Sequence, residues 1–406
     1  MILQLRPVHH LFQFFLEKRA IILYLRKPHR PTYHGKMKNN PNPGITYRFN
    51  VLFRIVAKEL LRAFYHFVYR PLRPSVRFHC RNIFEGRNAL IFANGEVTCV
   101  CADHGLINLG NVNDSSVEDI WKGKGFEDLR KSFRNNRLPL RHCAVCFAFE
   151  KIKKPSDDIY DITPFFWNTH IETTPVCNLE CAICRRDEVE KHRGNARLSP
   201  DTVYRMLDEI IKHKTNKFVL FFGFGEPFLD KNIYDYVSYL KERFPEVIVS
   251  ISTNGIPLDN ENNVEKLLNT PLDIVLFSVD GITQEEYVKY RKGGDLKRAL
   301  SAMERLVNKR QTKGLAHPYI VWQYLYFRWN DSDKSLRATV NHARKIGVDL
   351  LHFLPTRTPI TGISWKNVLR RDSNVMYKFG SIDHDYNPHG RSRVIQVTDD
   401  MEEIPL

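Results

Sequence analysis

The sequence lacks the features of a secreted or membrane-spanning protein. No signal peptide opens it, and the apolar stretch Met1 to Tyr24 is interrupted by Arg6, Glu17, Lys18 and Arg19 before it reaches the ~20 residues that a spanning helix needs. No cysteine stands outside two groups, whereas a secreted disulfide framework would scatter its cysteines through a shorter chain. These absences favour a protein of the reducing cytoplasm.

Acidic residues are scarce at the start of the chain. Residues 1–80 hold 15 Lys/Arg and 2 Asp/Glu, so +13 of the formal charge of +15 lies there. The remaining 326 residues are close to neutral. The basic character therefore belongs to an N-terminal element, residues 1–79, and not to the rest of the protein.

A helix is predicted over residues 47–70, after a linker from Lys27 to Gly44 that contains four prolines and two glycines. Its polar residues recur every four positions, and the rest of the helix is a broad apolar face. The polar residues are Asn50, Arg54, Lys58, Arg62, His66 and Arg70. Three interpretations stay open. The helix packs on the protein's own barrel with its charged stripe in solvent, it lies in a membrane surface on the cytoplasmic side, or it is an RNA-binding arm. The last has no RNA-binding motif to support it.

The residues from Cys177 to Cys184 read C-N-L-E-C-A-I-C, and this spacing lets three thiolates meet one metal cluster. A [4Fe–4S] cluster normally takes four cysteine ligands, so three leave one iron open for a substrate or cosubstrate. The preceding residues, Asn168 to Thr174, alternate like a strand. The cysteines are therefore expected at the carboxyl end of a first β-strand, where α/β barrels place their chemistry.

Four further motifs follow in order, each where a predicted strand meets a loop. They are Gly223-Phe-Gly-Glu-Pro227, Ser252-Thr-Asn-Gly255, Ser278-Val-Asp-Gly281, and Arg291 within Tyr290-Arg-Lys-Gly-Gly294. Together with the cysteine loop they resemble the radical S-adenosylmethionine (radical SAM) superfamily. The resemblance implies that Cys177, Cys181 and Cys184 hold a [4Fe–4S] cluster whose open iron binds SAM.

The resemblance also implies roles for residues around the cluster. The segment containing Gly223, Gly225, Glu226 and Pro227 would bind the methionyl amino group, and Arg291 would reach the SAM carboxylate. Other expected contacts with SAM are Ser252, Asn254, Ser278, Asp280 and, near the adenine at a position that is often aromatic, Ile183. The alternative for Ser278 and Asp280 is strand-end capping and turn formation.

Five cysteines precede the barrel, within residues 80–150: Cys80, Cys99, Cys101, Cys143 and Cys146. With an Asn94-Gly95 hairpin turn, Leu109-Gly-Asn111 and Val117-Glu-Asp-Ile-Trp121, they resemble a SPASM/twitch-type auxiliary-cluster domain. In that family the domain commonly follows the barrel, and here it precedes it. An auxiliary [4Fe–4S] cluster is expected, with structural zinc as the alternative. Five cysteines for four positions leave open whether Cys99 or Cys101 is a ligand.

Strands and helices alternate through residues 166–356. The strands are expected near 168–174, 217–223, 247–253, 273–279, 319–327 and 349–354, with helices such as 201–214 and 232–243 between them. The fold class is therefore α/β, and the resemblance implies a partial (β/α)6 TIM-type barrel. Residues 357–406 lose periodicity and are expected to form a C-terminal tail or lid.

The expected function is that of a radical SAM enzyme. The resemblance implies reductive cleavage of SAM to a 5′-deoxyadenosyl radical that abstracts a substrate hydrogen, with an external electron donor such as a flavodoxin or ferredoxin. A peptide or protein is the first substrate expected, because SPASM-bearing relatives most often modify these. The alternatives are a carbohydrate, nucleotide or lipid-linked substrate at a membrane surface, and a non-catalytic metal-cluster protein that binds membrane or nucleic acid through its basic N-terminus. Nucleic acid is not among the expected partners of the enzyme.

Overall fold

The computed structural model describes most of the chain, with backbone alone for residues 45–54. The described residues are 45–99, 107–182, 184, 186, 194, 196–356, 362–364, 366, 375–379 and 393–397. The predictions for Met1 to Tyr24, Cys101, Ile183 and most of residues 357–406 fall outside them. The chain divides into two compact units, one of Met1–His79 with Ser132–Ile159 and one of Cys80–Lys131 with Tyr160–Leu406.

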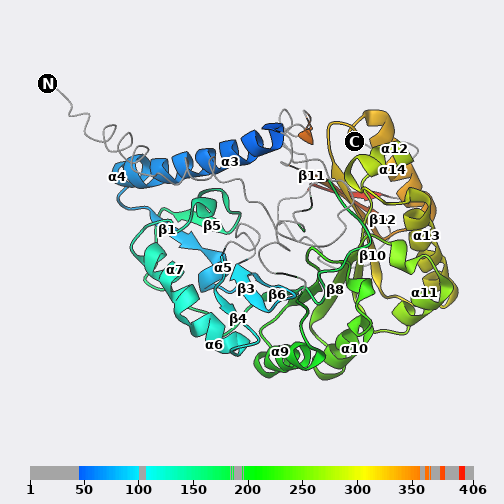
Figure 1. Ribbon diagram of the computed structural model, residues 1–406, viewed down its shortest axis with the longest axis horizontal. Coiled ribbons are helices and arrows are strands. Elements are labelled where there is room, and N and C mark those ends of the chain that lie inside the picture. Colours follow the sequence, from blue (N-terminus) through cyan, green and yellow to red (C-terminus); the bar gives the residue numbers. More distant parts are fainter. Residues whose placement is uncertain are drawn as a thin grey trace, which may run out of the picture. The chain divides into compact units, whose positions relative to one another are not determined.

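The first unit is built around a long helix and a small sheet. The predicted helix is confirmed as α3 (Ile45–Phe64), which continues through a π-helical turn, η1 (Tyr65–Tyr69), into α4 (Arg70–Leu72). It ends before Pro74, whose ring disfavours the helical conformation for the residue that precedes it. Strands β1 (Arg77–Cys80) and β5 (Phe149–Ile152) form a two-stranded sheet, and the 3-10 turn η2 (Arg141–Val145) packs against α3 (Figure 1).

The polar side of α3 faces the protein. Lys58 Nζ lies 2.9 Å from His142 Nδ1, and Arg62 donates to the Leu138 carbonyl oxygen. The backbone N–H of Leu138 donates to His66 Nε2 at 2.8 Å. Burial, with nearby arginines, lowers the pKa of His66 to about 4, so the ring is neutral and can accept this bond. The expectation of a charged stripe in solvent is therefore wrong, because these polar groups pair with residues 138–142.

Aromatic contacts attach the π-helical turn η1 to the two-stranded sheet. The ring of Tyr65 meets Phe78 and Phe149 edge-on, with centroids 5.8 and 5.3 Å apart, and Tyr69 stacks on Phe78. Such pairs contribute roughly 0.5–1.5 kcal/mol each beyond the area they bury. The helix is therefore held by hydrogen bonds along one stripe and by ring packing near its end.

The second unit is organised by one eleven-stranded sheet, in the order β13-β12-β11-β10-β9-β8-β7-β6-β2-β3-β4. All six predicted barrel strands are confirmed, within three residues at each end: β6 (Asn168–Ile171), β7 (Phe218–Phe221), β8 (Ile248–Thr253), β9 (Ile274–Ser278), β10 (Tyr319–Tyr326) and β11 (Leu350–Pro355). Neighbours among these six strands are parallel. This is the parallel arrangement that alternating strands and helices predict.

Short strands extend the sheet beyond both ends of the barrel set. On one side β2 (Ala89–Ile91) pairs in parallel with β6 and continues through antiparallel β3 (Glu96–Cys99) and β4 (Gly110–Asn111). The predicted Asn-Gly turn joins β2 to β3, with Gly95 at φ 88°. On the other side lie β12 (Val375–Phe379) and β13 (Arg393–Val397). The segment expected as an aperiodic tail therefore contributes two strands, which were too short to show a period.

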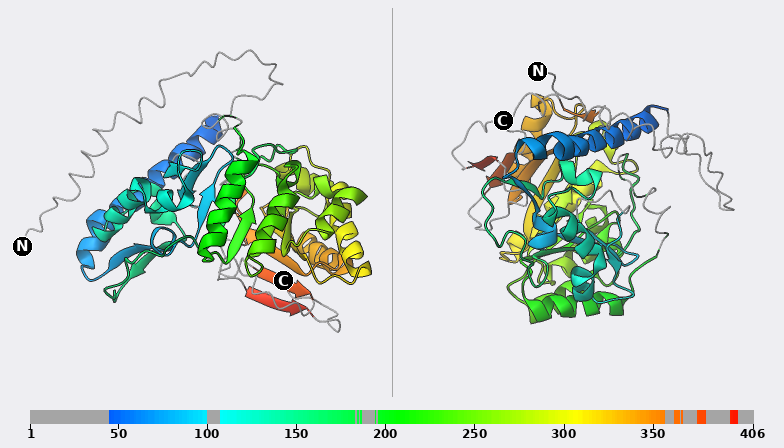
Figure 2. Two further views of the ribbon diagram at one scale, coloured as in Figure 1. Left: turned by 90° about the horizontal axis from the view of Figure 1, so that it is seen from below. Right: turned by 90° about the vertical axis from the view of Figure 1, so that its left-hand side faces the viewer.

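Helices cover the outer face of the barrel strands. They are α9 (Pro200–His213), α10 (Ile233–Arg243), α11 (Glu261–Leu268), α12 (Gln284–Tyr290), α13 (Leu296–Thr312) and α14 (Asp333–Ile346). Figure 2 shows α9 and α10, drawn in green, side by side. Ser199 caps α9 by accepting from the Thr202 N–H, and Pro200 occupies the first helical position; both residue types favour a helix start at these places. Among the described residues no helix is both long and apolar enough to cross a membrane.

Residues that precede the barrel in the second unit pack around the buried Trp121. Helices α5 (Arg81–Phe84), α6 (Val117–Lys122) and α7 (Lys124–Arg134) follow β1 and β4. The Trp121 ring meets Phe126 edge-on and Phe166 at a tilt, and its Nε1 donates to the Thr163 carbonyl oxygen at 2.8 Å. The Arg130 guanidinium lies 4.1 Å from the centroid of the Trp121 ring. The Glu-Asp-Ile-Trp motif thus anchors this segment to the residues that lead into the barrel.

Strand register separates an apolar layer from a polar one on the inner face of the sheet. Six buried side chains form one apolar cluster: Ile274, Leu276, Tyr319, Val321, Leu350 and Met376. Two residues further along each strand, the same face carries Ser278, Gln323 and His352, which are paired in register on β9, β10 and β11. The apolar layer therefore lies toward the amino ends of the strands, and polar side chains lie toward the carboxyl ends.

Candidate functional site

Three cysteines lie in the loop that follows β6. Cys177, Cys181 and Cys184 are all partly exposed, and none of the seven described cysteines of the chain forms a disulfide. The loop turns back on itself, because the Cys184 N–H donates to the Cys181 carbonyl oxygen at 3.0 Å. Arg186 holds the same turn by donating from Nη1 to the carbonyl oxygens of Cys177 and Leu179.

The thiols of this loop interact electrostatically. Burial raises the pKa of Cys177 to about 11 and raises that of Cys184, and in both cases the nearby Cys181 contributes further. Thiols in such a setting stay protonated until a metal displaces the proton. Three clustered thiols with no disulfide fit three of the four ligand positions of a [4Fe–4S] cluster.

Backbone hydrogen bonds join the turn that contains Arg291 to the cysteine loop. The backbone N–H groups of Glu180 and Ala182 donate to the carbonyl oxygens of Lys292 and Tyr290, at 3.0 and 2.8 Å. The guanidinium of Arg291 lies beside the cysteines, with Nη1 3.8 Å from Cys181 Sγ. A cation at this place offers a binding partner to a carboxylate.

Asp280 is fully buried and fixes the orientation of Arg291. Its Oδ2 accepts from Arg291 Nε at 2.6 Å, and its Oδ1 accepts from the Leu325 N–H at 2.6 Å. Burial raises the pKa of Asp280, and the adjacent guanidinium opposes that shift. Both carboxylate oxygens are thus engaged within the protein, so the geometry favours a positioning role for Asp280 over the direct SAM contact that the sequence suggested.

The glycines of the Gly223–Pro227 loop are explained by close approach to the end of β6. A Cβ at Gly225 would collide with the Thr174 carbonyl oxygen, and one at Gly223 would lie 2.6 Å from side-chain atoms of Glu172. The Glu226 N–H donates to the Val176 carbonyl oxygen at 2.8 Å. The loop therefore lies directly on the segment that carries the cysteines.

Glu226 joins the same loop to the end of β8. Its buried carboxylate accepts from Thr253 Oγ1 at 2.7 Å and from the Asn254 N–H at 2.8 Å. Burial raises the pKa of Glu226 to about 7, although these hydrogen bonds lower it. Pro227 begins the 3-10 turn η3 (Pro227–Leu229), for which Glu226 is the cap.

Asn254 completes the connection between β8 and the cysteine loop. Its Nδ2 donates to Asn178 Oδ1 at 2.8 Å and lies 4.0 Å from Cys177 Sγ. On the inner face of the sheet, Ser252 Oγ and Ser278 Oγ lie 3.4 Å apart. The predicted site residues from Cys177 to Asp280 that the structure describes are therefore at the carboxyl ends of β6 to β9 or in the loops that follow them. Arg291 is instead the C-cap of α12, so the expectation that it follows a strand directly is wrong. Ile183 lies outside the described residues.

Glu172 was missed by the sequence reasoning. Its Oε1 accepts from the N–H groups of Phe224 and Gly225, at 2.6 and 3.2 Å, and its Oε2 accepts from the Ala93 N–H at 3.2 Å. It is buried, with 4% of its surface exposed. An acidic side chain within the predicted strand 168–174 was the available signal, because a buried carboxylate needs partners.

Replacing Glu172 with glutamine is expected to weaken SAM binding about tenfold. The amide turns one acceptor into a donor that faces a backbone N–H, at a cost of roughly 1–3 kcal/mol to the geometry of the Gly223–Gly225 loop. Equilibrium dialysis of SAM against the cluster-loaded protein measures this.

Glu209→Gln is the matched control for Glu172→Gln. The Glu209 carboxylate also accepts from two backbone N–H groups, those of Val117 and Glu118, at 3.0 and 2.8 Å, but on α9. It should lower stability and leave the affinity for SAM unchanged. Equal effects of the two variants on SAM binding would reduce Glu172 to a purely structural residue.

Two family models match the chain. One, described as the radical SAM superfamily, matches residues 171–320, which contain the cysteine loop and the loops packed on it. The other, SPASM, described as an iron–sulfur cluster-binding domain, matches residues 80–147. This protein belongs to the radical SAM superfamily.

A [4Fe–4S] cluster and SAM are the cofactors of its radical SAM domain, and an auxiliary iron–sulfur cluster is that of its SPASM domain, which precedes the barrel.

Curated relatives match this radical SAM protein over part of their length. A "Probable GTP 3′,8-cyclase" of Methanococcus maripaludis is 25% identical over 188 residues, 46% of this chain and 58% of the relative. The "FeMo cofactor biosynthesis protein NifB" of Methanocaldococcus jannaschii is 31% identical over 136 residues, 30% of this chain and 45% of the relative. The chain thus spans about half the length of these relatives.

Among solved structures, that of Streptococcus suis SuiB bound to precursor peptide SuiA aligns over 45% of this chain and 38% of its own, with 16% identity and a TM-score of 0.37.

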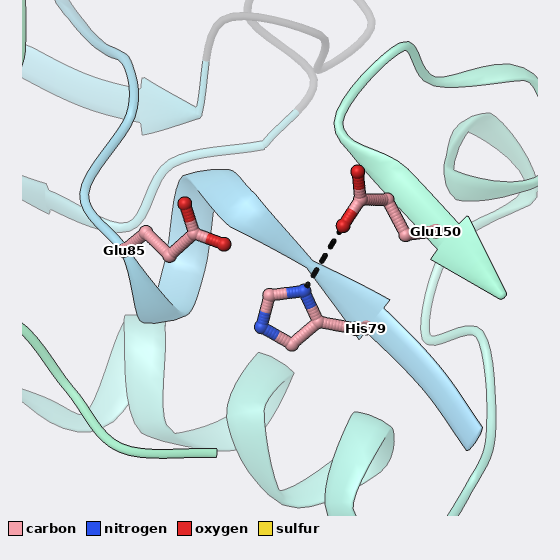
Figure 3. Close-up of side chains that lie close together, drawn as sticks. All are labelled: His79, Glu85 and Glu150. Carbon is pink, nitrogen blue, oxygen red and sulfur yellow. Dashed lines mark ion pairs between the residues drawn. The ribbon is translucent and has the colours of Figure 1, made fainter. Parts of the chain in front are cut away.

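The SPASM cysteines of this radical SAM protein are distributed over both compact units. Cys80, buried at the end of β1, and Cys99, at the end of β3, belong to the second unit. Cys143 and Cys146 belong to the first, around η2, where the Cys146 N–H donates to the Cys143 carbonyl oxygen. Also in the first unit, His79 Nδ1 faces the Glu150 carboxylate at 3.7 Å (Figure 3). Cys101 lies outside the described residues, so the choice between Cys99 and Cys101 stays open.

Proposed function

We propose that the protein reductively cleaves SAM at a cluster held by Cys177, Cys181 and Cys184 and uses the product radical to take a hydrogen atom from a substrate. The observation that carries this is the joining of four loops around the three thiols. The loops after β7 and β8 and the turn after α12 all contact the cysteine loop, through Glu226, Asn254 and the backbone beside Arg291. A protein that only stored a cluster would have no use for this convergence.

In this proposal each group of residues binds a different part of the cluster or of SAM. Three thiolates leave one iron open, and the backbone of Gly223 to Pro227 binds the SAM amino group. Arg291, held by Asp280, pairs with the SAM carboxylate through the part of its guanidinium that Asp280 does not use. Ser252, Asn254 and Ser278 supply further polar contacts, and Ile183 packs near the adenine.

When bound, the cluster supplies the electron that splits SAM into methionine and a 5′-deoxyadenosyl radical. The chain's own contribution is to bind, orient and exclude water. The apolar layer of the sheet closes the site toward the amino ends of the strands, and the polar layer with Ser278, Gln323 and His352 faces the carboxyl ends. A substrate bound beside SAM would meet this polar layer.

The SPASM cysteines are proposed to hold the auxiliary cluster. Cys80, Cys143 and Cys146, with either Cys99 or Cys101, would supply four thiolates, and such a cluster would carry electrons. With an open iron it would instead bind substrate directly. The external reductant is proposed to be a flavodoxin or ferredoxin.

A peptide or protein is the substrate class that we propose first, and the presence of a SPASM domain supports it. A nucleotide, carbohydrate or lipid-linked substrate at a membrane surface is the second candidate. The observation that favours the second is the apolar face that α3 presents to solvent. Product analysis with candidate peptides and lipid-linked sugars separates the two.

The chemistry is tested by metal content and by SAM cleavage together. After anaerobic reconstitution, about eight irons per chain are expected, falling to about four when Cys177, Cys181 and Cys184 are all replaced. With dithionite, only the unsubstituted protein should form 5′-deoxyadenosine. About four irons falling to none, with zinc present throughout, would mean that the SPASM cysteines are a structural zinc site.

A further inference from the structure

The helix of the first unit carries an exposed apolar stripe. It consists of Leu60, Phe64, Phe67, Val68 and Leu72, which are 43, 45, 54, 37 and 73% exposed. Their spacing of three and four residues puts them on one face. Soluble surfaces rarely gather large apolar side chains in this way unless something binds them.

The orientation of the helix makes the stripe unusual. An amphipathic helix ordinarily buries its apolar face and leaves its polar face in water. Here Lys58, Arg62, His66 and Arg70 contact residues 136–142 of the same unit, so the polar face is the one directed at the protein. The apolar face is therefore not a remnant of core packing, because the core contacts of the helix are made elsewhere.

Charge indicates the class of partner. The first unit, residues 1–79 and 132–159, has 21 Lys/Arg and 5 Asp/Glu, whereas the second unit has 40 and 41. All of the protein's net positive charge thus lies in the unit that carries the stripe. At the end of the stripe, Arg73 is exposed, and Lys151, also exposed, lies over the rings of Tyr65 and Tyr69.

We infer that the apolar stripe of α3 to α4 inserts into the interface of an anionic membrane. Leucine, valine and phenylalanine enter the boundary between headgroups and acyl chains, while exposed basic residues such as Arg73 and Lys151 pair with lipid phosphates. A nucleic acid would be attracted by the same charge, but its phosphates and bases give Leu60, Val68 and Leu72 nothing to contact favourably. This inference goes beyond the proposed chemistry and does not depend on it.

The test is co-sedimentation of the full chain with vesicles. Vesicles of phosphatidylcholine with about 30% phosphatidylserine, at about 0.1 M salt, should carry the protein down, and pure phosphatidylcholine should do so much less. The variant Leu60→Gln, Phe64→Gln, Phe67→Gln keeps the charge and the helix propensity. It should lower the partition onto anionic vesicles by more than about tenfold.

A matched control uses three apolar residues of similar exposure outside the stripe. Ile162, Leu315 and Val394 are 40, 40 and 51% exposed. Their triple replacement by glutamine should leave vesicle binding unchanged, and circular dichroism and iron content verify that both triple variants fold.

Three results would overturn the inference. The first is no binding of the unsubstituted protein to anionic vesicles, and the second is equal binding by the stripe variant. The third is a dimer that light scattering detects and that the stripe variant loses, without vesicle binding, because a second copy would then cover the stripe.

Discussion

Replacing Cys181 with alanine should abolish formation of 5′-deoxyadenosine and remove about four irons per chain. Cys181 contributes to the raised pKa of both Cys177 and Cys184, and its thiol lies 3.8 Å from the Arg291 guanidinium. It is therefore at the centre of the proposed ligand set. With two thiolates left, the cluster loses a ligand and SAM loses the iron to which it binds. Anaerobic turnover with dithionite, followed by chromatography, measures the first effect, and iron analysis measures the second.

Cys146→Ala is the reciprocal variant. Its thiol accepts from the Ala148 N–H in the first unit and is assigned to the SPASM cluster. The two single variants should each lose iron, and the double variant should lose the sum. Cleavage of SAM by Cys181→Ala at the unsubstituted rate would refute the assignment of the cluster to this loop.

Replacing Asp349 with alanine should destabilise the second unit by roughly 3–5 kcal/mol. Arg310 and Asp349 form a buried bidentate ion pair, with N–O distances of 2.5 and 3.0 Å and exposures of 5 and 6%. Asp349 also accepts from the Ile320 N–H at 2.6 Å. Its loss therefore leaves the buried Arg310 charge and the Ile320 N–H without this carboxylate as a partner. A fall in melting temperature of roughly 5 to 15 °C is expected.

The comparison for Asp349→Ala is an exposed ion pair. Asp128, on α7, pairs with Lys124 at 2.5 Å with both side chains largely in water. Its replacement by alanine should change stability by no more than about 0.5 kcal/mol, because such pairs are screened and flexible. Similar melting temperatures for the two variants would show that burial of the Arg310 pair does not determine its contribution.

The barrel strands were predictable because alternating or apolar stretches recur between helical segments, and because a chemical motif follows each of the first four. The pairing of β2 with β6 was not, because alternation fixes which side of a strand is buried and leaves its neighbour undetermined. Those two strands are about 80 residues apart in the sequence. Strands β12 and β13 were missed since five residues each, separated by polar sequence, show no helical or strand period.

The site was predictable as a set of motifs and less so as a set of contacts. Sequence placed Asp280 near SAM, and the structure adds its partners within the protein: its two oxygens accept from Arg291 Nε and the Leu325 N–H. It overlooked Glu172, whose partners are backbone N–H groups and so leave no complementary residue type to find. The polar and apolar faces of α3 could likewise be predicted from the sequence. Which face contacts the protein could not, because it depends on hydrogen-bonding groups in residues 136–142.

The pairing of β2 with β6 also determines which strand forms one edge of the sheet. A six-stranded partial barrel would end at β6 with a row of unpaired N–H and carbonyl groups, a ready template for strands of other molecules. Here β2 covers that row, and the sheet continues to β4, which has two residues. So short a border strand offers little for another chain to pair with. The inverted domain order therefore protects the barrel against aggregation along the side where its first strand would otherwise stand open.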